Sequence, residues 1–330
     1  MSGIRRCLMV GVGMVVSGTA LWLVAGSVDV REAVDVIRRA DPVPLVGIVG
    51  VVAAQTVLRA WRWSILLPAR ADGTRVSATR LLPPMLVGYL GNAVLPARLG
   101  EPMRAVIAAR RERTGTTEAL GSVLVERLTD ITMLALVGLA AAVVLAGPAW
   151  TIQVLGFASG FGLSIMIVLL TIGLEPVLRV ADRLGLRNRH KVRVVAGRFA
   201  AVLGGRSRRS ALLAAAGISV VCWLLDAGSF WLAAQAVGVD LPYVAAVVVG
   251  AISVLGTAVP SAPGYVGTFE LAAAGTAVAV GVAVAEALAL AVVVHVATLV
   301  PLALGGAISL AAMGPNFGEV ARAAETTPRA

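Results

Sequence analysis

Long apolar runs separated by polar loops dominate the chain. They lie at about 7–26, 43–66, 119–146, 150–174, 211–237, 268–284 and 286–313. Most of them reach the roughly 20 residues that an α-helix needs to cross the hydrocarbon core of a bilayer. The pattern predicts an all-α polytopic membrane protein with about seven to eight transmembrane helices. The first run follows Arg5 and Arg6, which also fits a signal peptide, but its length favours a retained helix.

Basic residues are distributed unequally among the loops between these runs. The loop at 27–42 carries a balance of acidic and basic residues, whereas the loops at 67–80 and 175–210 are rich in arginine. Cytoplasmic loops of membrane proteins carry the excess of arginine and lysine. Both basic loops and the N-terminus are therefore predicted to be cytoplasmic.

The apolar stretch at about 81–97 is short and interrupted. The residues that break it are Pro83, Pro84, Gly88, Gly91, Asn92 and Pro96. Basic residues flank it on both sides, and a segment with positive charge at both ends is most simply a re-entrant hairpin that enters and leaves on the cytoplasmic side. The two spanning runs that follow return the chain to the basic loop at 175–210, which agrees with this topology.

A second interrupted stretch, at about 243–270, resembles the first. The sequence LGNAV (90–94) stands before the first break and LGTAV (255–259) before the second. The predicted topology places the first entry inside and the second outside, and paired broken segments of this kind indicate a transporter site near the bilayer midplane. We expect an inverted repeat in a single domain over 1–313, with half one at about 1–174, the basic loop at 175–210, half two at about 211–313, and a polar tail at 314–330.

Composition and motifs exclude several classes of function. Hydrophobic residues make up 58% of the chain and charged residues only 14%, against about a quarter charged in soluble domains. The net charge of +10 lies in loops without interleaved aromatic residues, so nucleic acid is not an expected partner. Cys7 and Cys222 have no disulfide or metal-ligand spacing. The chain has no hydrolase, ATPase or zinc-protease motif, so we expect no catalytic residue, metal or cofactor.

Arg98, Glu101 and Arg104 follow the first broken stretch at intervals of three residues. If this segment is helical, Glu101 has an arginine one turn away on each side. A pair of guanidinium groups oriented by a carboxylate suits a phosphate, because arginine offers a planar fork of donors. A salt bridge at the membrane surface that caps the helix is the alternative.

Glu126, Arg127 and Asp130 lie in the first turns of the run at 119–146. Glu126 and Asp130 share a helix face, with Arg127 about 100° round the helix axis. Ionisable groups inside a membrane span are costly and indicate function, but these positions also fit the membrane interface. Both interpretations remain open at this point.

Three more ionisable residues lie in the second half. Asp226 and Glu270 are expected either to be protonated or to pair with an arginine across the repeat interface. His295 stands alone in an apolar run. For this imidazole we favour a hydrogen bond that serves helix packing over a role in a proton relay.

Four segments carry a family resemblance. They are RAWRW (59–63), GYLGNAVLPARLGEPMR (88–104), ERLTD (126–130) and PGYVGTFE (263–270). The chain resembles the flippase-like lysylphosphatidylglycerol synthase transmembrane-region family over nearly its whole length, without the aminoacyl-transferase domain that some members carry. By matching to these motifs, the resemblance implies substrate-binding roles for Asn92, Arg98, Glu101, Arg104, Glu126, Arg127, Asp130, Gly264 and Glu270.

The resemblance also implies a function. We expect a lipid flippase that moves an anionic lipid or a polyprenyl-phosphate-linked glycan precursor across the bacterial cytoplasmic membrane. Its expected partners are that lipid or lipid-linked sugar phosphate, the surrounding membrane lipids and envelope glycosyltransferases. The alternatives are a membrane enzyme that modifies a lipid headgroup, with Glu126 or Asp130 as general base, and a non-catalytic scaffold for envelope synthesis.

Overall fold

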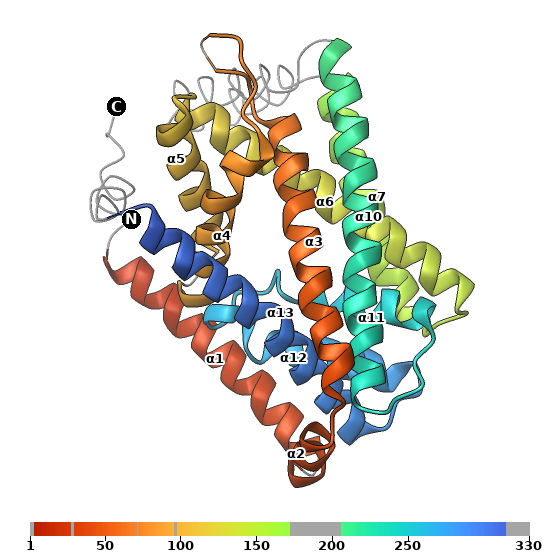
Figure 1. Ribbon diagram of the computed structural model, residues 1–330. Coiled ribbons are helices and arrows are strands. Elements are labelled where there is room, and N and C mark those ends of the chain that lie inside the picture. Colours follow the sequence, from red (N-terminus) through yellow and green to blue (C-terminus); the bar gives the residue numbers. More distant parts are fainter. Residues whose placement is uncertain (1–2, 28–29, 71, 96–97, 172–205, 315–330) are drawn as a thin grey trace.

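The computed structural model describes residues 3–27, 30–70, 72–95, 98–171 and 206–314, and every regular element in these ranges is a helix (Figure 1). The long helices are α1 (Gly3–Ser27), α3 (Pro42–Leu66), α6 (Thr116–Val144), α7 (Ala149–Thr171), α10 (Arg206–Ala236) and α13 (Val284–Ala312). The short helices are α2 (Val30–Arg38), α4 (Ala78–Val94), α5 (Gly100–Glu112), α11 (Tyr243–Gly256), η1 (Pro263–Tyr265) and α12 (Thr268–Ala279).

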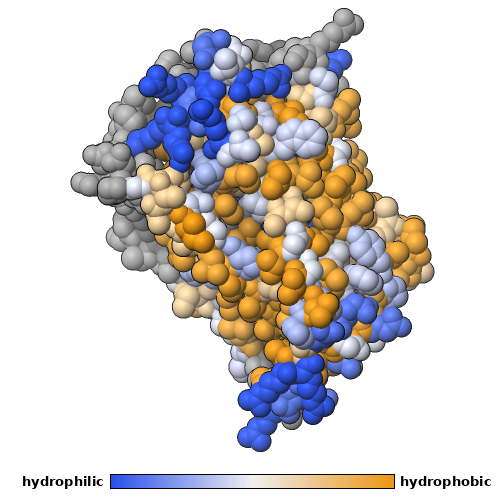
Figure 2. All heavy atoms as spheres, viewed as in Figure 1, coloured by the Kyte–Doolittle hydropathy of each residue, from blue (hydrophilic) through white to orange (hydrophobic). Residues whose placement is uncertain are grey.

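The long helices confirm the all-α polytopic membrane class. Within the described residues, five of them are long and apolar enough to cross a bilayer, namely α3, α6, α7, α10 and α13. Helix α1 adds an apolar stretch at Gly11–Leu23. Figure 2 shows hydrophobic residues over the middle of the molecule and hydrophilic residues at its two ends, one of which is formed by α2. Most of the basic loop predicted at 175–210, and all but the first residue of the tail at 314–330, lie outside the described residues.

Helices α4 and α5 form a hairpin that enters and leaves at one end of the molecule. The stretch at 81–97, expected to form such a hairpin by itself, supplies only the first arm, because α4 continues through Pro83 and Pro84 without a break and α5 is the return arm. Arg70, just after α3, and Arg80, at the start of α4, both pair with Glu112 in the last turn of α5. The end of α3, the start of α4 and the end of α5 therefore lie together. We call residues 78–112 the first hairpin.

Helices α11 and α12, joined through η1, form a second hairpin, residues 243–279. It starts directly after α10, and the end of α10 lies beside the start of α3, because the N–H of Asp41 donates to the carbonyl of Ala236 at 2.8 Å. The second hairpin thus enters from the end opposite to the first. The apolar run expected at 268–284 is its 12-residue second arm, α12.

Glycine allows the arms of each hairpin to approach closely. A β-carbon on Gly100 would overlap with the carbonyl oxygen of Gly88 on the opposite arm, and one on Gly256 would lie 2.7 Å from the β-carbon of Ala272. Small residues at such crossings are typical of helix packing in membranes, where van der Waals contact replaces the hydrophobic effect as the driving force.

Helix α1 packs against the loop of the second hairpin. The N–H of Ala262 donates to the Ser17 hydroxyl at 2.8 Å. Gly13 lies against backbone atoms of Ser261, and Gly267 lies against backbone atoms of Ser17. These contacts join α1 to the second hairpin, and the retention of this helix stays a prediction.

Candidate functional site

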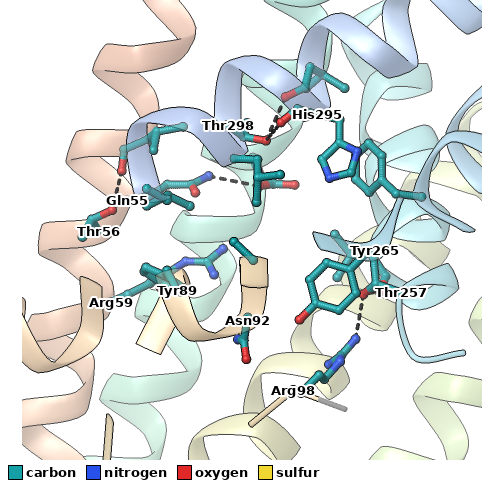
Figure 3. Close-up of a pocket in the computed structure, with 18 of the residues that line it drawn as sticks. Gln55, Thr56, Arg59, Tyr89, Asn92, Arg98, Thr257, Tyr265, His295 and Thr298 are labelled. Atoms are coloured by element: carbon teal, nitrogen blue, oxygen red, sulfur yellow. Dashed lines mark hydrogen bonds between the residues drawn. The ribbon is translucent and has the colours of Figure 1, made fainter. Parts of the chain in front are cut away.

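A cavity of about 210 Å³ lies where the tips of the two hairpins face α3, α10 and α13 (Figure 3). Its charged lining residues are Arg59, Arg98, Glu101, Arg127 and Asp226. Non-helical backbone at membrane depth is tolerated only where it is buried in protein or lines a water-filled space. The position of both tips at this cavity satisfies that condition.

Arg98 and Tyr265, one from each tip, contact each other across the cavity. Both have a left-handed backbone, with φ of 54° and 61°, which is uncommon for residues other than glycine and costs conformational energy. The Arg98 guanidinium lies 5.3 Å from the centre of the Tyr265 ring and donates to the Thr257 hydroxyl at 2.7 Å. Arg98 therefore connects the first hairpin to the second.

Asn92 joins the two arms of the first hairpin. Its side-chain oxygen accepts a hydrogen bond from the N–H of Gly100 at 3.0 Å, and its amide nitrogen donates to Glu101 at 3.3 Å. Asn92 and Thr257 occupy the same place in the two LGxAV segments, and both line the cavity. The predicted similarity of the two broken stretches thus has a spatial counterpart.

A buried cluster of three arginines and three carboxylates lies beside the cavity. Arg62 pairs with Glu126 at 2.8 Å and with Asp130, and Arg104 pairs with Glu126 at 3.1 Å. Glu101 forms two further ion pairs, with Arg104 at 2.8 Å and with Arg127 at 2.6 Å. The cluster joins α3, α5 and α6, and its formal charges balance.

Arg62 and Trp63 of the RAWRW segment point into the protein. Both side chains are fully buried, whereas Trp61 is 52% exposed. Arg62 also donates to the Ser219 hydroxyl on α10 at 2.7 Å, and the Trp63 ring lies under the guanidinium of Arg104 at 4.6 Å. The segment contributes a helix-packing arginine to the ion-pair cluster.

The structure corrects the expectation that Arg98 and Arg104 flank Glu101 on one helix. Arg104 is a helical neighbour of Glu101, but α5 starts only at Gly100, so Arg98 precedes the helix and turns toward the second hairpin. Arg127 from α6 takes the second place at Glu101. Arg104 is 2% exposed and does not line the cavity, so it is not available to a ligand there.

Two guanidinium groups in the cavity have no carboxylate partner within the ranges that the structure describes. Among the described residues, neither Arg98 nor Arg59 forms an ion pair. The Nε atom of Arg59 is buried without a hydrogen-bond partner, and its guanidinium lies 5.0 Å from the centre of the Trp223 ring. These two groups are therefore the ones that an anionic ligand can reach and pair with.

Glu270 was expected to be protonated or to pair with an arginine, and it contacts a histidine instead of an arginine. Its carboxylate lies 2.5 Å from Nδ1 of His295 and accepts from the N–H of Gly267 at 2.6 Å. His295 thus makes a hydrogen bond between helices, as favoured from the sequence. Gly264 has a φ of +70°. A β-carbon added at Gly264 would lie 3.5 Å from the carbonyl oxygen of Ala93 in the first hairpin.

The nine predicted site residues therefore fall into three groups. Asn92, Arg98, Glu101 and Arg127 line the cavity. Arg104, Glu126 and Asp130 lie behind it in the ion-pair cluster, and Gly264 and Glu270 shape the second hairpin. Their roles in binding remain predictions.

The sequence interpretation missed Arg59, Arg62 and Tyr265 as site residues. Arg59 and Arg62 are three residues apart in a run that spans the bilayer, and this spacing within a helix was the available signal. Among the described residues, no group of three or more His, Cys, Asp or Glu side chains is placed to hold a metal ion. Cys222 is a buried free thiol.

Comparison with known proteins identifies a family and a curated relative. Residues 10–306 match the family described as the lysylphosphatidylglycerol synthase TM region. The chain is 28% identical over 306 residues to a protein of Haloferax volcanii named glycosyltransferase AglD, covering 82% of this chain and 48% of the relative. The chain thus spans about half the length of that relative. No solved structure matches.

Proposed function

The chain belongs to the lysylphosphatidylglycerol synthase TM region family, and from this premise we propose that it is a lipid flippase. It moves an anionic lipid or a polyprenyl-phosphate-linked glycan precursor across a bacterial cytoplasmic membrane, with the N-terminus in the cytoplasm. The observation that carries the proposal is the cavity at the hairpin tips, in which Arg59 and Arg98 have no carboxylate partner in the described part of the chain. Guanidinium groups of this kind bind the oxygens of a phosphate.

The arrangement of the hairpins supports a transport mechanism. Two hairpins that enter from opposite ends and meet at one cavity are the arrangement expected of inverted repeats with a central site. We propose that the headgroup binds between the tips and that the contacts of Arg98 with Thr257 and Tyr265 separate on one side at a time. The lipid chains remain in the bilayer while the headgroup crosses.

The relative's name supports a place in envelope chemistry. AglD is named as a glycosyltransferase, which favours a lipid-linked glycan or its phosphate carrier as substrate, and a glycosyltransferase as functional partner. This chain spans only 48% of that protein, so the catalytic activity in the name is not transferred with the match.

A headgroup-modifying enzyme is the second candidate, and the geometry gives it less support. Glu126 and Asp130, the carboxylates considered as general bases, each contact two arginines and do not line the cavity. A general base has to reach the proton that it abstracts.

A scaffold without transport activity would tolerate substitution of Arg59 and Arg98 altogether.

Transport into proteoliposomes tests the proposal. Full-length protein is reconstituted with fluorescent phosphatidylglycerol or a labelled polyprenyl phosphate, and movement between leaflets is followed by quenching from outside. Arg59→Ala and Arg98→Ala should each reduce the rate about tenfold or more, since each removes charge-assisted hydrogen bonds.

The matched control is Arg111→Ala, which removes an exposed arginine at the end of the first hairpin and should leave the rate unchanged. Equal rates in all three variants would contradict the flippase proposal. A chemically altered lipid in mass spectra of the vesicles would favour the enzyme.

A further inference from the structure

Asp226 is a carboxylate in the cavity that forms no ion pair among the described residues. It lies on α10, and within the described residues its side chain accepts a single hydrogen bond, from the Gln55 amide at 3.4 Å, which is long for a hydrogen bond. The same amide also donates to the carbonyl of Cys222 at 3.0 Å. A carboxylate with so few donors is poorly stabilised in its charged form.

Few charged groups face Asp226 from the helices around it. Arg59 faces it from α3 and Asp130 from α6, while the titratable hydroxyl of Tyr243 faces it from α11. From α13, His295 lines the same cavity but pairs with Glu270. Arg59 is thus the cation that faces Asp226. No ion pair joins the two within the described part of the chain.

Arg59 needs an anion nearby, because a lone guanidinium within a membrane protein is costly. The carboxylate form of Asp226 would supply that negative charge at a distance. When an anionic headgroup binds at Arg59, a second negative charge on Asp226 repels it in a site of low dielectric constant. Protonation of Asp226 removes this repulsion.

We propose that Asp226 takes up one proton when the anionic headgroup binds at Arg59, so that proton and anion occupy the cavity together. This inference rests on the proposed function and adds the coupling ion to it. In the bound state the carboxyl is neutral and the phosphate pairs with the guanidinium. In the empty state the carboxylate is charged and the proton has returned to solvent.

Binding measured against pH tests the coupling. The probe is dihexanoylphosphatidylglycerol, a phosphodiester that lacks the second ionisation shown by phosphate monoesters at about pH 6. The full-length protein is held in nanodiscs of phosphatidylcholine, and Kd is measured from about pH 5 to about pH 9. Uptake of one proton per anion predicts that Kd rises about tenfold per pH unit once Asp226 is ionised in the empty protein.

Variants assign the proton to a residue. Asp226→Asn, which mimics the neutral carboxyl, should bind the probe with a Kd that no longer depends on pH. His295→Gln should keep the dependence, and Asp35→Asn, at an exposed pair on α2, should behave as the unaltered protein. A dependence that persists in Asp226→Asn, or that disappears in His295→Gln, overturns the inference and leaves the flippase proposal in place.

Infrared difference spectra of the ligand-free protein test the proton site without any ligand. A protonated-carboxyl band that appears on acidification and is missing in Asp226→Asn supports the inference, and the same band in both proteins overturns it. Failure of the probe to bind at any pH counts against the flippase proposal, while the infrared result still decides whether Asp226 is the proton site.

Discussion

Both hairpins place a tip at the cavity, but different interactions hold the two tips. In the first hairpin, Glu101 near the start of α5 binds Arg104 and Arg127, and Asn92 ties the arms together. In the second hairpin, the corresponding Glu270 caps its own helix and contacts His295.

The two tips also differ in their backbone. The second tip has two glycines with positive φ, Gly264 and Gly267, around Tyr265. Its contacts with α1 and with the first hairpin are mainly van der Waals contacts and single hydrogen bonds. The first hairpin is therefore anchored by buried charge, and the second by close packing. We expect the first to be the harder of the two to displace.

Loss of a charge in the cluster should have the largest effect. Arg62→Met leaves Glu126 and Asp130 with one fewer cation in a buried site, and breaking a buried ion pair costs about 3–5 kcal/mol. Thermal unfolding in detergent, followed by tryptophan fluorescence, measures this. Arg38→Met, at an exposed pair on α2, should change stability by less than about 1 kcal/mol. Equal shifts in the two variants would remove the distinction.

Added β-carbons should destabilise the first hairpin more than the second. Gly100→Ala places a methyl group against the backbone carbonyl of Gly88, whereas Gly256→Ala meets a side-chain methyl. Overpacking costs about 1–3 kcal/mol, and we expect Gly100→Ala at the upper end. Gly217→Ala in α10, where an added β-carbon would meet no described atom within 4 Å apart from the helix's own neighbouring backbone, should be neutral or slightly stabilising. A larger loss for Gly256→Ala than for Gly100→Ala would reverse the comparison.

The histidine contact should contribute less. His295→Leu leaves Glu270 with only its helix-capping hydrogen bond, at a cost of about 1–2 kcal/mol. Hydrogen exchange should then increase in α12 and leave α5 unaffected. Increased exchange in both hairpins would show that the two are coupled as a single unit.

The smallest effect is expected at the contact between the tips. Thr257→Val removes the hydroxyl that accepts from Arg98 and keeps the shape of the side chain, which costs about 1 kcal/mol. Transport by this variant should change only a few fold. Thr276→Val, which removes a hydroxyl bonded within α12, is the control and should transport at the unaltered rate.

The helical class and the first broken stretch could be predicted because they depend on local properties. Run length and arginine in the loops are properties of adjacent residues, whereas Pro83 and Pro84, expected to interrupt the stretch, lie inside the continuous helix α4. The membrane class is confirmed, and so is the expectation that the first hairpin enters and leaves at the same end. The side of the membrane and the inverted repeat stay predictions.

The pairing of charges could not be predicted, because it depends on contacts between distant segments. Arg62 meets Asp130 across 68 positions, and Arg98 meets Thr257 across 159. Helical spacing alone assigned Arg98 to Glu101. Arg98 has a left-handed backbone and lies before the start of α5, so helical spacing does not apply to it. Arg59 and Arg62 carry equal charge in sequence, and only packing shows that Arg62 is ion-paired while Arg59 faces the cavity.

The central claim is that an anionic headgroup binds at Arg59 and Arg98 between the hairpin tips. Equilibrium binding of dihexanoylphosphatidylglycerol to nanodisc-held protein tests it most directly, at a pH low enough for Asp226 to be protonated. Arg59→Ala and Arg98→Ala should each raise Kd about tenfold or more, and the lysine variants should recover part of the loss, since lysine keeps the charge but lacks the planar fork. An unchanged Kd in both alanine variants, with Arg111→Ala as reference, would contradict the account.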